Sequence, residues 1–200
     1  MSDMMIEPMF SRPLGITKIE KLPHITDLEN LEYRVAPWNK KSNTGEFSKN
    51  IQFLSSYPEL ERTITKEVQD FNNKVMCYTD NTVVLTKSWV TRFKPGIKGN
   101  LHNHKNCMYS AVLYMDDKGS SMTLADYNNH YMYDIYPKEY NQFSTKSYTI
   151  APEKGKLIIF PAFISHTVDP NISNSVRYSI VANYTIKGPI GYEDTSWEIK

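Results

Sequence analysis

The feature that most constrains the fold of this chain is a long series of short strand-like segments in its second half. From Thr82 onward, stretches rich in Val, Ile, Thr, Tyr and Trp alternate with turn-like sequences such as Asp-Asp-Lys-Gly and Pro-Glu-Lys-Gly. The predicted strands cover residues 82–93, 108–115, 121–126, 147–150, 156–160, 165–168 and 176–186. Many strands with no helix between them favour a mainly β sandwich or barrel of the jelly-roll type.

One helix is predicted before this series of strands. Its apolar face is formed by residues at spacings of four, four, three and four: Leu60, Ile64, Val68, Phe71 and Val75. Ser56 is the predicted N-cap, and Pro58 stands in the first turn. We expect this face to pack on a sheet and to carry no chemistry.

The chain is predicted to form a single domain over residues 1–200, with one or two supporting helices in its N-terminal half. Residues 1–55 are punctuated by prolines and are expected to wrap irregularly around a β core at residues 82–186. The stretch from Tyr127 to Lys146 contains five tyrosines and interrupts the strand pattern. It is predicted to be a lid or binding loop, or else an extra hairpin over a sheet edge.

Composition excludes several functional classes. The chain is 40% hydrophobic and 22% charged with a net charge of +1, which is typical of a globular domain without a nucleic-acid footprint. Two cysteines, Cys77 and Cys107, favour a reducing compartment over a disulfide framework. No signal peptide or membrane-spanning run is apparent, so we expect a cytoplasmic location and no membrane partner. The oligomeric state is open, with a homodimer as one state considered.

A local group of basic residues is the only charge cluster. It is formed by Lys87, Arg92, Lys94, Lys98 and Lys105. We interpret it as a solvated face, because charged side chains usually lie at the surface.

The candidate chemistry begins with a His-x-His pair, His102 and His104. On an extended chain, residues i and i+2 point to the same face, so both imidazoles can reach one ion. The pair stands just before a predicted strand, where ligand sites at the mouth of a barrel commonly form. A third histidine, His166, follows the buried-strand sequence Leu157–Pro161. These three histidines are the predicted metal ligands.

A buried arginine supplies the second part of the predicted site. On a strand, Arg177, Ser179, Val181 and Asn183 share one face. An arginine on the inner face of a small barrel is costly unless an anion neutralises it, and a carboxylate matches its paired donors. Ser179 would add a hydrogen bond, and Tyr114, on the face shared by Ser110 and Val112, would supply a further donor to the same anion.

These motifs resemble the Fe(II)/2-oxoglutarate-dependent oxygenases, whose layout is a His-x-(Asp/Glu) motif, a distal histidine and an arginine about ten residues later. Segments 112–116, 158–160, 166–170 and 177–180 are similar to the prolyl-hydroxylase branch. Trp89, the His-x-His pair, the strand 110–114 and the Ser42-Asn43 turn are similar to a family of bacterial and phage 2-oxoglutarate oxygenases. The resemblance covers roughly residues 40–186.

The resemblance implies a double-stranded β-helix, Fe(II) as metal and 2-oxoglutarate as co-substrate, bound through Tyr114, Arg177 and Ser179. It implies oxidation, most simply hydroxylation, of a small molecule or peptide that the sequence does not name. One departure is His104, which replaces the commoner carboxylate and leaves the site more positive and open to other divalent metals. Asp116 and Asp126 are fallback carboxylates, and Cys107 a fallback fourth ligand.

Two other functions compete with this one. A cupin-like protein with three histidines would bind metal without 2-oxoglutarate, although the glutamate of a cupin motif is absent from residues 105–108. A non-catalytic β-sandwich would bind a partner or sugar through its tyrosine-rich loop. His24 and His130 are expected to be structural, and the three tryptophans, Trp38, Trp89 and Trp197, to pack in the core, with Trp89 a candidate for the substrate cleft.

Overall fold

The computed structural model describes residues 4–35, 44–126 and 137–200. The helical segments are α1 (Ile25–Glu29), η2 (Phe53–Ser56), α2 (Pro58–Lys74) and η3 (Glu193–Thr195). The strands are β1 (Gly15–Lys18), β2 (Tyr33–Arg34), β3 (Glu46–Ser48), β4 (Thr82–Phe93), β5 (Tyr109–Tyr114), β6 (Met122–Ala125), β7 (Ser147–Ile150), β8 (Lys156–Pro161), β9 (Ser165–Val168), β10 (Arg177–Ile190) and β11 (Trp197–Ile199).

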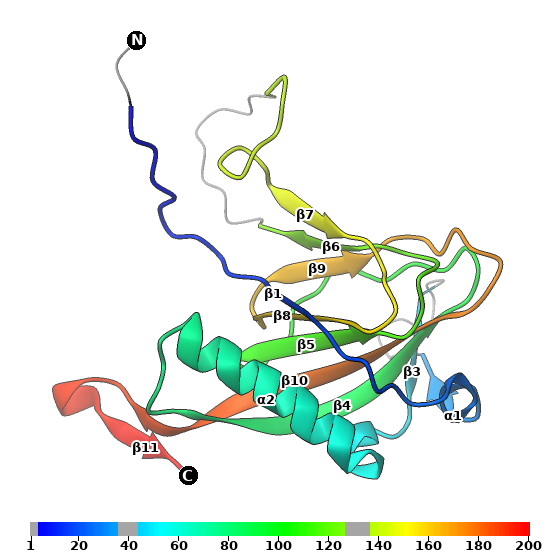
Figure 1. The fold of residues 1–200 in the computed structure, drawn as a ribbon, viewed down its shortest axis with the longest axis horizontal. Coiled ribbons are helices and arrows are strands. Elements are labelled where there is room, and N and C mark those ends of the chain that lie inside the picture. The colour runs from blue at the N-terminus through cyan, green and yellow to red at the C-terminus, as the bar shows by residue number, and fades with distance from the viewer. Residues whose placement is uncertain (1–3, 36–43, 127–136) are drawn as a thin grey trace.

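Two antiparallel sheets face each other. The large sheet has the order β1-β8-β5-β10-β4-β3-β2, with β11 paired to the far end of β10. The small sheet has the order β7-β6-β9 and lies over one face of the large sheet (Figure 1). This arrangement is the predicted jelly roll, a double-stranded β-helix in which the chain passes repeatedly between the two sheets from β5 to β10.

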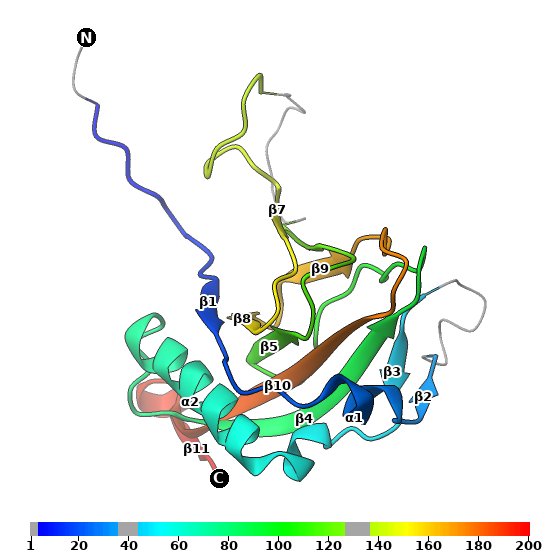
Figure 2. The same ribbon diagram turned by 45° about the vertical axis from the view of Figure 1, so that its right-hand side comes forward.

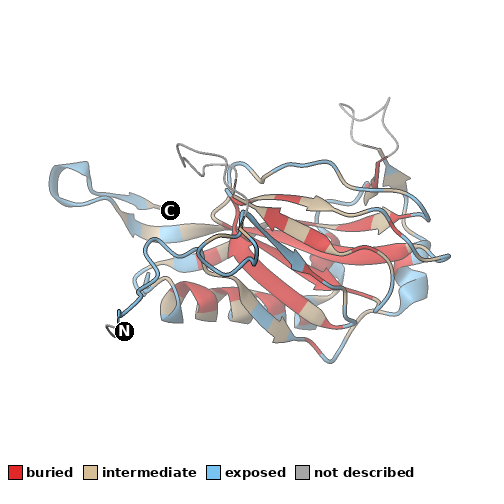
Figure 3. Cartoon of the chain, turned by 90° about the horizontal axis from the view of Figure 1, so that it is seen from above, coloured by how far each residue is buried: buried red, intermediate tan, exposed pale blue. Residues whose placement is uncertain are grey.

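The apolar core has two layers because side chains alternate across the strands of the large sheet. On the outer face, α2 packs on the sheet through Leu60, Ile64, Val68 and Phe71 (Figure 2). On the inner face, a second cluster fills the space between the sheets and includes Val112, Ile158 and Val181. Buried residues therefore line both faces of the central strands (Figure 3).

The strand predictions are confirmed closely, and β4, β7 and β9 have the predicted bounds. β10 runs beyond the predicted end at residue 186, because its last residues pair with β11. The N-terminal region, predicted as an irregular wrap over residues 1–55, contains short strands between irregular stretches. β1 pairs with β8 at one edge of the large sheet, and β3 pairs with β4 near the other, so this region extends the sheet and covers its edges.

Three predictions about single residues were wrong. Ser56 does not cap α2, because it lies in the last position of η2 and Tyr57 precedes the helix instead. Val75 is 51% exposed, since α2 ends at Lys74. Trp197 does not pack in the core and is 62% exposed on β11. Trp38 lies outside the described residues. None of the helices in the described ranges has the length and apolar character needed to cross a membrane.

Candidate metal centre and its pocket

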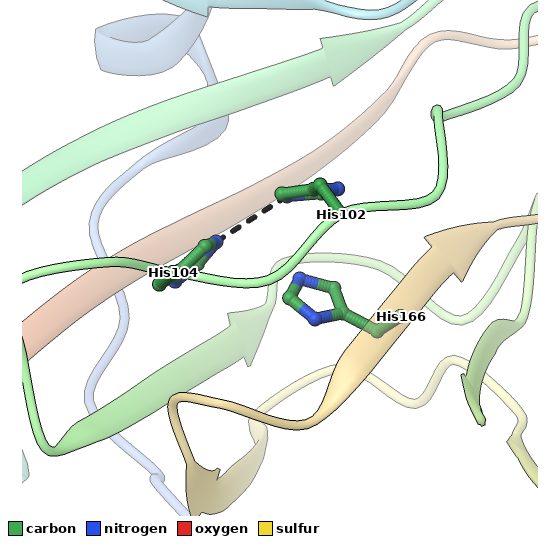
Figure 4. Close-up of side chains that lie close together, drawn as sticks. All are labelled: His102, His104 and His166. Carbon is green, nitrogen blue, oxygen red and sulfur yellow. Dashed lines mark hydrogen bonds between the residues drawn. The ribbon is translucent and has the colours of Figure 1, made fainter. Parts of the chain in front are cut away.

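Three histidines from two separate segments converge between the sheets. His102 N donates to His166 O at 3.0 Å, and His166 N donates to His102 O at 2.8 Å, so these two residues form an antiparallel backbone pair. Side chains of such a pair lie on the same face, and His104, two residues on, shares that face. One nitrogen of each ring lies within 4.8 Å of the others (Figure 4). Nε2 of His102 and Nε2 of His104 are 3.3 Å apart.

The outer nitrogen of each imidazole is held by a fixed oxygen. His102 Nδ1 lies 2.8 Å from Asn100 O, and His166 Nδ1 lies 3.1 Å from Ile164 O. A carbonyl oxygen only accepts, so both Nδ1 atoms carry the proton and both Nε2 atoms keep a free lone pair. This is the tautomer that a histidine needs to bind a metal through Nε2.

His104 is oriented by two side chains rather than by the backbone. Its Nδ1 lies 2.8 Å from Asn183 Oδ1 and 2.9 Å from Ser110 Oγ, and Ser110 Oγ donates to Asn183 Oδ1 at 3.1 Å. Asn183 and Ser110 are register partners on β10 and β5. Asn183 and Ser110 therefore hold Nδ1 of His104, and its Nε2 points toward the centre of the three-histidine cluster.

Burial keeps the inner histidines neutral. Desolvation, with a smaller contribution from neighbouring His102, lowers the pKa of His104 to about 4. Desolvation, followed by the same kind of repulsion from His102 and His104, lowers the pKa of His166 to about 3. Neutral imidazoles are the form that coordinates a cation, so the cluster is ready to bind metal at neutral pH.

Arg177 is the second element of the site. Its side chain is 2% exposed, and its Nε has no hydrogen-bond partner. Its Cζ lies 5.5 Å from the centre of the Phe93 ring and 5.1 Å from that of Tyr114. Within the described part of the chain, no carboxylate lies within 4.0 Å of its nitrogens. A buried cation without an anion is unfavourable, and burial lowers the pKa of Arg177 accordingly.

Further buried polar groups, on β10, on its neighbours β4 and β5 and at Thr44, also have no hydrogen-bond partner. They are the buried Oγ of Ser179, the hydroxyl of Tyr114, Oγ1 of Thr44 and Nε1 of Trp89. Ser179 pairs in register with Tyr114 on one side and with Thr91 on the other. Desolvation raises the pKa of Tyr114 to about 12, so its hydroxyl remains a donor. Buried polar atoms are rarely left unsatisfied, which indicates that a ligand with several acceptors completes them.

A pocket of about 670 Å³ connects the two elements. It is lined by all three histidines, by Arg177 and Ser179, and by Trp89 and Val181 between them. Tyr114 is not among its lining residues; it lies against Arg177 instead. The pocket therefore contains both a candidate metal centre and a candidate anion site.

The fallback ligands lie elsewhere. Asp116 Oδ2 accepts from Tyr178 N at 3.0 Å, and Asp126 pairs with Arg12. Cys107 lines the pocket, but the three-histidine cluster does not include it. His24 caps α1 by accepting from Thr26 N. His130 and half of the tyrosine-rich insertion, residues 127–136, lie outside the described residues, so the prediction of a lid there stays a prediction.

The supporting roles of Asn183 and Ser110 were not predicted. Strand alternation placed both residues on the inner face. Only the tertiary structure shows that they are register partners on β10 and β5 and that both contact His104. Thr44 was likewise missed as a pocket residue, since nothing in its local sequence connects it to residues 93–98.

Comparison with known proteins agrees with this geometry. Residues 87–183 match the family described as "Putative 2OG-Fe(II) oxygenase". No curated protein sequence matches the chain. Among solved structures, a prolyl-4-hydroxylase of Pseudomonas putida aligns with a TM-score of 0.54 at 14% identity, covering 88% of this chain and 94% of that chain.

Two further structures show the same fold. An oxidoreductase of the 2OG-Fe(II) oxygenase family from Burkholderia pseudomallei has a TM-score of 0.52 at 14% identity, covering 80% of this chain and 75% of its own. The epimerase SnoN, solved in complex with Fe³⁺, alpha ketoglutarate and nogalamycin RO, has a TM-score of 0.55 at 11% identity, covering 82% and 73%. At these identities the likeness establishes the fold.

Proposed function

We propose that the chain is an Fe(II)/2-oxoglutarate-dependent oxygenase and that its own residues carry this activity, as the family match over residues 87–183 and the shared fold support. His102, His104 and His166 hold the iron. Arg177, Ser179 and Tyr114 hold the far carboxylate of 2-oxoglutarate. The proposal depends on one observation. Three imidazoles whose Nε2 atoms are free to bind a metal line the same pocket as a buried arginine, and no carboxylate of the described residues is paired with that arginine.

The histidine cluster fits a divalent iron. Three nitrogen donors on one side of a cation leave the other side open for co-substrate and oxygen, which is the general plan of non-haem iron oxygenases. The Nδ1 partners of all three rings supply the outer hydrogen bonds that orient such ligands. His104, where a carboxylate is commoner, brings no negative charge.

The arginine end fits a carboxylate. Arg177 offers Nε, and Ser179 and Tyr114 offer hydroxyl groups that have no other partner. A carboxylate can accept all of these bonds at once and neutralise the buried guanidinium. The inner-face positions of β10 and β5 thus bind one end of the co-substrate while the histidines bind the other.

When bound, iron and 2-oxoglutarate supply the oxidising chemistry, in which 2-oxoglutarate and oxygen are converted to succinate and carbon dioxide and one oxygen atom oxidises the substrate. The chain itself binds and orients these groups. Val112, Met122 and Val181 line the pocket with apolar surface and restrict water around the site. Hydroxylation of a C–H bond remains the reaction that we propose.

In a cupin-like metalloprotein that does not use 2-oxoglutarate, Arg177 would have no role. Such a protein would bury an unneutralised guanidinium at a cost and leave the Ser179 and Tyr114 hydroxyls unsatisfied. The family match also supports the oxygenase. We further propose a cytoplasmic location, supported by two cysteines that are both free.

The decisive experiment measures succinate formation and oxygen consumption by the purified protein with Fe(II) and 2-oxoglutarate. We expect slow uncoupled turnover in the absence of substrate, lost in His166→Ala. His24→Ala is the matched control, because His24 is a structural histidine on α1 and should leave turnover unchanged. Direct titration with Mn(II) tests the metal site separately from turnover. Wild-type turnover or Mn(II) binding in His166→Ala would overturn the assignment of ligands.

A further inference from the structure

The pocket is strongly asymmetric in charge. Its lining residues include Arg34, Lys87, Lys105 and Arg177, and none of the lining residues in the described part of the chain is Asp or Glu. The whole chain has nearly balanced charge, with 23 basic and 22 acidic residues. An all-cationic lining in a balanced protein concentrates positive potential inside one cleft, which attracts anions.

The basic residues lie at two ends of the pocket. Arg177 pairs in register with Phe93, and Asn183, six residues along β10, pairs with Lys87. At about 3.3 Å per residue the two cations are separated by roughly 20 Å along the sheet. Lys87 is thus level with the residue that supports His104, and Lys105 follows His104 directly. The metal centre lies between Arg177 at one end and this pair of lysines at the other.

The lysines at the second end have no ion pair. No carboxylate in the described residues lies within 4.0 Å of Lys87 or Lys105. By contrast, Arg92 and Lys94 share Glu46, at 2.8 and 3.3 Å. The basic group predicted from the sequence therefore divides. Arg92 and Lys94 are neutralised by Glu46, whereas Lys87 and Lys105 line the pocket with no carboxylate of the described ranges paired to them.

The proposed cofactors do not remove this excess charge. Imidazole ligands bring no charge to the metal, which therefore keeps its full charge of +2, and Arg177 adds +1, while 2-oxoglutarate contributes −2. The loaded centre therefore stays positive before Lys87 and Lys105 are counted. A cationic substrate would meet an unfavourable potential there, a neutral substrate would gain nothing from it, and an anion would be attracted.

An apolar wall with one free donor joins the lysine end to the metal. Trp89 lies two residues from Lys87 on the same face of β4, and its ring centre is 5.6 Å from that of His104. Its buried indole Nε1 has no hydrogen-bond partner. Phe47, Ile51 and Leu101 also line the pocket. This part of the pocket offers apolar surface and one hydrogen-bond donor beside the two lysines.

We propose that the primary substrate is a small organic anion with an apolar body. Its acidic group, a carboxylate or a phosphate ester, is bound by Lys87 and Lys105, and a neutral acceptor further in takes the indole N–H of Trp89. This inference rests on the proposed function, because it assigns Arg177 to 2-oxoglutarate. A polyanion such as nucleic acid is disfavoured, since the net charge is only +1 and these lysines lie at a pocket rather than along a basic face.

The test uses the full-length protein with Mn(II) and saturating 2-oxoglutarate, so that Arg177 is occupied and no turnover occurs. Calorimetry compares hippurate, which combines a phenyl ring, an amide and a carboxylate, with its neutral analogue hippuramide. We expect hippurate to bind about tenfold more tightly, since charge-assisted bonds discriminate to this extent. Phenyl phosphate, compared with hippurate, distinguishes a phosphate from a carboxylate preference.

Variants assign the effect to residues. The double variant Lys87→Met/Lys105→Met should abolish the preference for hippurate, whereas Lys187→Met, an exposed lysine on β10 outside the pocket, should preserve it. Trp89→Phe should weaken both probes by roughly threefold and leave their ratio unchanged. If Trp89→Phe instead weakens 2-oxoglutarate alone, the indole belongs to the co-substrate site and its role here is wrong.

Failure of this inference can be separated from failure of the proposed function. Binding of Mn(II) and 2-oxoglutarate is measured first in the same samples, and its absence would overturn the proposed function. If both bind but hippurate and hippuramide have equal affinity, the anionic substrate is wrong while the oxygenase stands. Displacement of hippurate by a short single-stranded oligonucleotide, more strongly than by phenyl phosphate, would replace the small anion with nucleic acid.

Discussion

Replacing Arg177 with methionine should weaken co-substrate binding without destabilising the free protein. Methionine keeps an unbranched apolar side chain in the same space but removes a charge that is 2% exposed. No carboxylate of the described residues pairs with Arg177 within 4.0 Å, and Asp116 attracts it only at longer range, so the buried charge opposes folding until a ligand arrives. The substitution therefore has opposite effects on the free and the ligand-bound states.

The magnitudes follow from the contacts of Arg177. Removing a buried, unneutralised ion stabilises a protein by about 1–4 kcal/mol. Against this, the guanidinium loses its contacts with the rings of Phe93 and Tyr114, at roughly 0.5–1 kcal/mol each. The net change in the free energy of unfolding is then about −1 to +3 kcal/mol, where a positive value favours the variant. Loss of the buried charge pair weakens 2-oxoglutarate by about 2–5 kcal/mol, roughly 30-fold or more.

Urea unfolding with Mn(II), with and without 2-oxoglutarate, measures both effects. At a concentration 100 times its dissociation constant, the ligand stabilises wild type by about 2.7 kcal/mol, and Arg177→Met should gain less than about 1 kcal/mol. Arg92→Met is the control, since Arg92 bonds to Glu46 and lies over Tyr33 outside the site. It should lose up to about 1 kcal/mol of stability and keep the full ligand effect. An unstable Arg177→Met protein with wild-type 2-oxoglutarate binding would refute the reasoning.

Three further changes test the surroundings of the site. Asn183→Leu removes the acceptor of His104 Nδ1 and should lower Mn(II) affinity about 10–100-fold in a direct titration, so unchanged affinity would contradict the supporting role. In the folded, metal-free protein, His104 and His166 have pKa values of about 4 and about 3, whereas the same side chains in the unfolded chain take up protons near pH 6.5. The free energy of unfolding should therefore fall as the pH is lowered from 6.5 toward 4. A urea midpoint that does not change with pH would contradict this prediction. Gly119→Ala, at φ +96° with a new Cβ 3.2 Å from Arg177 Cβ, should cost about 1–3 kcal/mol in urea unfolding, and a neutral result would show that the turn adapts.

Much of this site could be predicted from local sequence patterns. Alternation along a strand has a period of two, so the face shared by Arg177, Ser179 and Asn183 follows from their spacing alone, as does the common face of His102 and His104. The order of strands and the position of α2 follow from apolar periodicity in the same way. Such patterns depend only on neighbouring residues, which is why they hold without knowledge of the fold.

Pairing between distant segments could not be predicted from those patterns. The prolines of the first 55 residues suggested an irregular wrap, yet backbone groups there satisfy the open edges of the large sheet at β8 and β4. Similarly, alternation places Lys87 and Arg92, five residues apart on β4, on opposite faces of the strand, but it does not say which face meets a pocket. The packing of the small sheet and of the 102–105 segment over the inner face decides that Lys87 and Lys105 line the same pocket. Sequence therefore determined which side chains share a strand face, and tertiary structure decided which faces meet.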